Sequence, residues 1–184
     1  MLEALLRLLG LHLKGGPGGF MIRSMLYATD LGLYAPYVLQ HAVVLARTFK
    51  AELHVVHVVE PMGLFAESVL QSYLTADALK ELHSEGVNTV IDGIEARVLA
   101  SFREELGEGH QDLALICSVR VVQGDPSKVI LDQARLLGVD LLVLGSRSKG
   151  GEGDTPIGRT AARVLQLSNV PVYMVPMLQR RPQT

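Results

Sequence analysis

The chain lacks tryptophan altogether, and it has one cysteine and five tyrosines among its 184 residues. A single cysteine excludes an internal disulfide, and the apolar neighbours of Cys117 predict a buried thiol that serves as a small hydrophobic side chain. Because a chain without disulfides fits a reducing compartment, we expect a cytoplasmic protein.

An excess of charge of either sign is also missing. Seventeen lysines and arginines against nineteen acidic residues give a formal net charge of -2. The protein therefore has no global electric field that would attract nucleic acid or an anionic membrane. We expect no nucleic-acid partner, and any anion-binding site must be local.

Signatures of catalysis and of metal binding are absent from the sequence. His54 and His57 are three residues apart on a predicted strand, so their side chains face opposite sides and cannot share a metal ion. We interpret both as packed or hydrogen-bonded histidines. No nucleophile-elbow pattern and no lysine-bearing phosphate loop is present. The sequence therefore predicts a protein that is not an enzyme.

The first twenty residues form a leucine-rich leader and a glycine linker. Residues 2–13 carry seven leucines, but this stretch is too short to span a bilayer and no small-residue cleavage site follows it. The helix predicted there docks on its own domain or on a partner subunit, or it belongs to an extension upstream of a domain that starts near Met21 or Met25. Attachment to a membrane surface is the remaining alternative, and we do not expect it.

The rest of the chain alternates between strand-like and helix-like apolar patterns. Its length suits one α/β domain with a full core and is too short for two, so we expect a domain over residues 21–177 and a flexible tail over 178–184. Strands are predicted at residues 25–29, 53–59, 118–122, 139–144 and 170–175. Helices are predicted at residues 36–49, 87–106, 126–137 and 160–168. The last helix should bury Ile157, Ala161, Val164 and Leu165.

This alternation predicts an α/β fold with an open, doubly wound, five-stranded parallel sheet and helices on both faces. Pro171 cannot donate to a strand ladder, so the last strand belongs near an edge. Asp125 and Pro126 have the residue types of a helix N-cap and first helical position, and Gly138 that of a C-cap. Ligands of such sheets bind beyond the carboxyl ends of the strands.

A glycine-rich loop follows the fourth predicted strand. The strand enters Gly145, and the loop reaches Gly158 before a helix begins at about Thr160. A strand, a glycine loop and a helix in this order aim backbone N–H groups and the positive end of the helix at a phosphate. Nucleotide binding is therefore the first hypothesis.

Five segments of the chain together resemble the universal stress protein family. They are Tyr27-Ala28-Thr29-Asp30, the strand ending His57-Val58, Gly124-Asp125-Pro126, the loop after Gly145, and residues 170–175. The resemblance covers residues 21–177. It implies the strand order 3-2-1-4-5 and a homodimer formed through strand five, by Val170, Val172 and Met174. In one branch of the family it also implies ATP, with Mg²⁺ through the phosphates, held across strands one and four.

The ATP-binding branch has a loop that reads Gly, two residues, Gly, nine residues, Gly, and then Ser or Thr. Gly145 and Gly158 match its first and last glycines with the spacing preserved, but Ser148 and Arg159 stand at the other two positions. If the glycine at this position is needed for a positive φ or for close approach of the backbone to a phosphate, Ser148 would strain the backbone or its β-carbon would intrude on the phosphate. The Arg159 guanidinium can pair with phosphate oxygens, or it can cap an internal carboxylate instead. Arg147 adds positive charge to the loop.

At the other end of the expected site, the resemblance places Asp30 near the adenine or the ribose and makes Ala28 and Val58 apolar or backbone contacts. Alternatively, Asp30 caps the next turn, and Ala28 and Val58 only pack the strands. The complete set of candidate nucleotide-binding residues is Ala28, Thr29, Asp30, Val58, Leu144, Gly145, Arg147, Ser148, Gly158, Arg159 and Thr160.

Three functions follow from these observations. The first is a dimeric stress-response protein of the universal stress type that acts by binding, with ATP or a related adenine nucleotide as a regulatory ligand. The second is a nucleotide-independent interaction module whose dimer and leucine-rich leader recruit a protein partner. The third is slow ATP hydrolysis or autophosphorylation, which no residue pattern in the chain supports.

Overall fold

The structure is a computed structural model that describes residues 21–61, 63, 69, 72–75, 77, 87–107, 111–147 and 157–176. The leader, the glycine linker and the tail expected over 178–184 lie outside these residues. The described elements, with η2 a short 3₁₀ helix, are β1 (Ser24–Thr29), α2 (Ala35–Phe49), β2 (Glu52–Val59), α5 (Val87–Leu106), η2 (Gln111–Leu115), β3 (Ile116–Gln123), α6 (Pro126–Leu137), β4 (Leu141–Gly145), α7 (Arg159–Leu167) and β5 (Val172–Val175).

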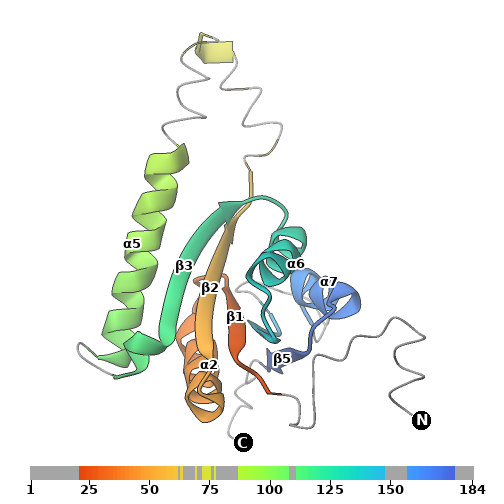
Figure 1. Cartoon of the computed structure of the whole chain (residues 1–184). Helices are drawn as coiled ribbons and strands as arrows, with labels where there is room; N and C mark the ends of the chain where they lie inside the picture. Colours follow the sequence, from red (N-terminus) through yellow and green to blue (C-terminus); the bar gives the residue numbers. More distant parts are fainter. Residues whose placement is uncertain are drawn as a thin grey trace, which may run out of the picture.

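The five strands form one parallel sheet in the order β3-β2-β1-β4-β5 (Figure 1). The chain first adds β2 and β3 on one side of β1 and then returns to add β4 and β5 on the other side. The strand order therefore reverses between β1 and β4, which is where open sheets of this kind bind ligands. The predicted α/β fold and strand order are confirmed.

Both faces of the sheet are covered by helices. Met25 and Tyr27 of β1 pack into the core beneath α2 and α5, whereas Leu26 and Ala28 pack on the opposite side against α6 and α7. Figure 1 shows α5 along β3, and α6 beside α7. Successive residues of a strand point to opposite faces, so a strand that is covered on both sides has apolar residues at consecutive positions of its sequence.

The predicted caps of α6 are confirmed. The Asp125 carboxylate accepts hydrogen bonds from the Lys128 N–H at 2.9 Å and from the Ser127 hydroxyl at 2.6 Å. These hydrogen bonds favour the charged form and lower the pKa of Asp125. At the other end, Gly138 adopts the left-handed conformation with φ 61°. Its N–H donates to the carbonyl oxygens of Ala134 and Arg135 in the last turn of the helix. Local sequence therefore determines where this helix begins and ends.

Strand boundaries differ from the prediction by up to two residues. β3 begins at Ile116 instead of residue 118, and β4 and β5 each begin two residues later than predicted. Before β4, Asp140 accepts hydrogen bonds from the backbone N–H groups of Arg23 at 2.8 Å and Ser24 at 3.1 Å. The Asp140 N–H also donates to the Ser24 carbonyl at 2.8 Å, so backbone contact with β1 begins here, just before the first residue of β4.

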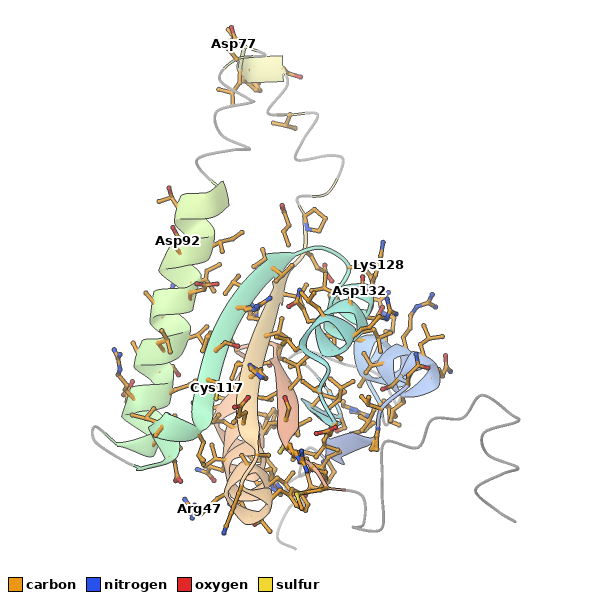
Figure 2. The ribbon with its side chains drawn as sticks, in the orientation of Figure 1. Arg47, Asp77, Asp92, Cys117, Lys128 and Asp132 are labelled. Carbon is orange, nitrogen blue, oxygen red and sulfur yellow. The ribbon has the colours of Figure 1, made fainter. Side chains whose placement is uncertain are left out.

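The prediction of a buried Cys117 is wrong, because its side chain is exposed. Cys117 lies near the start of β3, the edge strand (Figure 2). The β2–β3 register shifts at this point: Leu53 pairs with Ile116 and His54 pairs with Ser118. Cys117 is the extra residue between these pairs, and an irregularity of this kind turns a side chain away from the regular alternation.

The predicted inner face of α7 is only half right. Ala161 and Val164 are buried, but Ile157 is 36% exposed and Leu165 is 40% exposed. Ile157 precedes the first residue of the helix, so the helical period does not determine its direction. Leu165 lies about 100° around the helix from Val164, outside the narrow stripe that this short helix buries.

His54 and His57 point in opposite directions, as their spacing predicts. The Nδ1 of His54 is hydrogen-bonded to the Ser118 hydroxyl at 2.8 Å, and the Nδ1–H of His57 donates to the Thr29 carbonyl at 2.9 Å. Among the described residues no group of histidine, cysteine, aspartate and glutamate side chains could hold a metal ion. Both histidines of β2 are hydrogen-bonded, as one of the two interpretations from the sequence expects.

Burial of His54 gives the protein a pH-dependent stability. Burial lowers the pKa of this imidazole, and nearby Arg120 lowers it further against the opposite effect of Glu52. The unfolded chain therefore takes up the proton first as the pH falls below about 6.5, so folding stability is full above that pH and declines toward the lower folded pKa. We expect the free energy of unfolding to drop less between pH 8 and pH 5.5 in His54→Asn than in the wild type. If urea denaturation gave the same drop in the free energy of unfolding for both proteins, the role assigned to His54 would be contradicted.

Candidate functional site

A cavity of about 540 Å³ lies beyond the carboxyl ends of β1, β2 and β4. This volume falls within the range of roughly 300–1,000 Å³ that is typical of small-molecule sites. The structure places ten of the eleven candidate residues around it: Ala28, Thr29, Asp30, Val58, Leu144, Gly145, Arg147, Gly158, Arg159 and Thr160. The eleventh, Ser148, lies outside the described residues.

The first wall of the cavity is the turn that follows β1. The Thr29 hydroxyl accepts the Leu31 N–H at 3.1 Å, and the Asp30 carboxylate accepts the Gly32 N–H at 2.9 Å. Asp30 therefore caps the turn, and it also lines the cavity. The two alternatives for this residue are compatible, because the two oxygens of a carboxylate can accept several hydrogen bonds at once.

The opposite wall is the junction of β4 with α7. The Ser146 N–H donates to the Val175 carbonyl at 2.8 Å, and the Gly158 N–H donates to the Ser146 carbonyl at 2.7 Å. These bonds hold the first turn of α7 beside the end of β4. The Gly158 amide is thus already engaged, and the helix leaves the N–H groups of Arg159, Thr160 and Ala161 without intrahelical partners. Those three amides are the groups that can receive an anion.

Charged side chains divide the cavity into two ends. The carboxylates of Asp30 and Glu60 follow β1 and β2, whereas the guanidinium groups of Arg147 and Arg159 follow β4 and begin α7. In the described part of the chain no carboxylate pairs with Arg159. An anion such as a phosphate suits the arginine end, and hydroxyl or amino groups suit the carboxylate end.

Several residues of the cavity were not among the candidates. Glu60 follows β2 just as Asp30 follows β1, so the rule that strand ends carry ligands could have found it. Pro126 and Ile130 of α6 also line the cavity, but no local signal marks them, because only the packing of α6 over the sheet brings them there. Tyr27 lines it too, and its hydroxyl donates to the Ala35 carbonyl at 2.9 Å. Burial raises the pKa of Tyr27, so the phenol stays neutral.

The fold and the cavity define a doubly wound α/β protein with a cavity of small-molecule size at the switch point of its sheet. The model of the universal stress protein family matches residues 21–176. The chain therefore belongs to the universal stress protein family.

Known members of the family resemble the chain along most of its length. Universal stress protein YxiE of Bacillus subtilis is 28% identical, over 84% of this chain and 99% of its own. Universal stress protein MJ0577 of Methanocaldococcus jannaschii is 26% identical, over 84% of this chain and 95% of its own.

Solved structures share the fold. The structure of the hypothetical protein MJ0577 superimposes with a TM-score of 0.66 at 23% identity, covering 87% of this chain and 99% of that one. UspA from Lactobacillus plantarum gives a TM-score of 0.62 at 22% identity, covering 85% and 99%. A universal stress protein in complex with cAMP gives 0.51 at 17% identity, covering 85% and 98%. Within the described residues no helix is long and apolar enough to cross a membrane.

Proposed function

We propose that the chain is a stress-response regulatory protein that binds an adenine nucleotide, ATP in the first instance, across β1 and β4. The observation that carries the proposal is that ten residues chosen from the sequence surround one cavity of suitable size. Two of them, Asp30 and Gly158, come from segments more than one hundred residues apart in the sequence. The same fold seats cAMP in another universal stress protein, which supports an adenine nucleotide as the ligand.

The charges of the cavity determine the orientation of the nucleotide. Its phosphates lie at the first turn of α7, where the amides of that turn, Arg147 and Arg159 stabilise negative charge. The ribose hydroxyls lie at Asp30, and the base lies against Ala28 and Val58. A Mg²⁺ ion, when present, binds through the phosphate oxygens.

We propose that the protein acts in the cytoplasm by binding and not by catalysis. A nucleotide regulates such a protein only when it binds two conformations or two assembly states with unequal affinity. The regulatory output is therefore a change in the population of a partner-binding state, and hydrolysis of the nucleotide is not needed for it.

Titration calorimetry of the full chain with ATP and MgCl₂ tests the proposal. We expect saturable heat, and we expect ATP to raise the melting temperature as the ligand concentration exceeds Kd. Denaturing the purified protein and analysing the released small molecules identifies a ligand that was already bound. Absence of saturable heat, of thermal protection and of a released adenine compound would together remove the proposal.

The second candidate function is a nucleotide-independent dimeric interaction module. β5 is an edge strand of the sheet, and Val170, Val172 and Met174 on or beside it are only half-buried in the single chain. A second copy that pairs along β5 would cover them and would satisfy the open strand edge. Sedimentation equilibrium at micromolar concentration is expected to give a dimer, and a monomer at all concentrations would exclude this interface.

The same candidate function assigns the capture of a protein partner to the leucine-rich leader. Deletion of residues 1–20 is then expected to abolish capture and to leave the dimer intact, since the leader is not part of β5. Pull-down with the full chain and the deletion variant compares the two. Capture that persists without the leader would count against this role.

A further inference from the structure

A second cavity of about 330 Å³ lies between α2 and α5, on the face of the sheet that these two helices cover. Its floor is apolar and comes from both helices: Leu39 of α2 and Val98 and Phe102 of α5 are buried core residues. It shares only Ala35 and His57 with the cavity at β4 and α7. An apolar cavity of this size with a few polar groups at its rim is the usual form of a small-molecule site.

The nitrogen-bearing side chains of this cavity, His57 and Arg97, lie at one end. His57 uses its Nδ1–H for the Thr29 carbonyl, so its Nε2 is the ring nitrogen that remains for a ligand. Arg97 lines the same cavity, and its guanidinium has no ion pair or hydrogen bond with any described residue. The Arg97 guanidinium at the rim of an apolar cavity matches a carboxylate, and the His57 Nε2 donates to the same group only when the imidazole is protonated.

The position of α5 against the sheet shows that these two groups share one end. The Glu95 carboxylate accepts the Val121 N–H at 3.0 Å, and Val121 is the cross-strand neighbour of His57. The part of α5 around residue 95 is therefore level with His57. Glu105, the acidic residue that lines the cavity, is eight residues beyond Arg97, or about 12 Å along the helix. Its charge lies at the opposite end from the two nitrogen groups.

From this arrangement we infer that the cavity between α2 and α5 is a second ligand site, which takes a small, mainly apolar carboxylic acid. The carboxylate lies at Arg97, beside the Nε2 of His57, and the hydrocarbon part lies on Val98, Phe102 and Leu39. Water leaves the apolar floor when the hydrocarbon part of the ligand enters, and this burial supplies affinity. The arginine selects the acid over neutral molecules of the same shape. This inference is independent of the proposed nucleotide site, because Arg97 does not line that cavity.

Titration calorimetry of the full chain with octanoate, hexanoate and octanamide tests the inference. Octanoate is expected to bind at least tenfold more tightly than octanamide, which has the same shape without the charge. It is expected to bind about fifteenfold more tightly than hexanoate, because each of its two additional methylenes contributes about fourfold when buried. Equal affinities of octanoate and octanamide, or no saturable heat with octanoate, would overturn the inference.

Two arginines of α5 provide a matched pair of variants. Arg97→Gln is expected to lower octanoate affinity at least tenfold and to leave octanamide binding unchanged, whereas Arg103→Gln, on the same helix but outside the cavity, leaves both unchanged. Equal losses in the two variants would show a nonspecific charge effect and overturn the inference. Octanoate is also expected to bind in the presence of saturating ATP. Strict competition would place it in the nucleotide cavity and overturn the inference as well.

Discussion

Replacing Gly158 with aspartate is expected to weaken ATP binding at least tenfold without lowering the stability of the fold. Gly158 is the N-cap of α7, with φ −66° and ψ 152°, a conformation that any residue adopts. Aspartate is a better N-cap than glycine, and its charge is favourable at the positive end of a helix. The same charge would stand where the phosphates of the nucleotide are expected, and like charges at short range repel by more than 1.4 kcal/mol.

The space around Gly158 allows the substitution. A β-carbon there would lie 3.5 Å from the Ser146 carbonyl oxygen and 3.6 Å from the Cα of Arg147, which are ordinary contacts. Gly158→Asn is the matched control, because it has the same shape and also caps helices but carries no charge. ATP affinity measured by calorimetry should therefore rank wild type, then asparagine, then aspartate. Equal affinities of the asparagine and aspartate variants would show that the phosphates do not lie at the start of α7.

Replacing Gly124 with alanine is expected to lower the free energy of unfolding by about 2–4 kcal/mol. Gly124 has φ +155°, a conformation that residues with a side chain rarely adopt, and a β-carbon would lie 2.7 Å from a methyl carbon of Val129. The substitution therefore strains the backbone and overpacks the start of α6. Since α6 lines the cavity proposed to bind the nucleotide through Pro126 and Ile130, ATP affinity should fall as well.

Gly93 provides the control for that substitution. It lies inside α5, and nothing lies within 4 Å of the position that a β-carbon would take. Gly93→Ala should therefore raise the free energy of unfolding by about 0.5–1 kcal/mol, because alanine favours the helix. Chemical denaturation of both variants measures the two effects, and a similar effect of the two substitutions would contradict the role assigned to Gly124.

Much of the site could be predicted because its residues follow strands. The apolar runs predict the strands, and in a parallel sheet the residues after them meet at one edge. Asp30, Gly145 and Gly158 are therefore found from the sequence. The lining residues of α6 could not be found in this way, since their periodicity indicates only that one face is buried. The side of the sheet that α6 covers depends on the crossover from β3 to β4.

The wrong predictions of burial for Cys117 and Leu165 have a common physical origin. Cys117 has apolar neighbours, but it stands at a shift of register between two strands, which local sequence does not encode. Leu165 has the spacing of a buried residue, but α7 buries only a narrow stripe. In both cases the surroundings come from segments far away in the chain, and these surroundings override local preference.

The amino-acid order alone determined the kinds of element, their succession, the caps of α6 and the glycine junction before α7, because these depend on residues within a few positions of one another. Tertiary structure decided which side chains face water, that Asp30 both caps a turn and lines a cavity, and that His57 borders two cavities. Those outcomes require contacts between segments that are distant in the chain, and such contacts form only when strands and helices pack together.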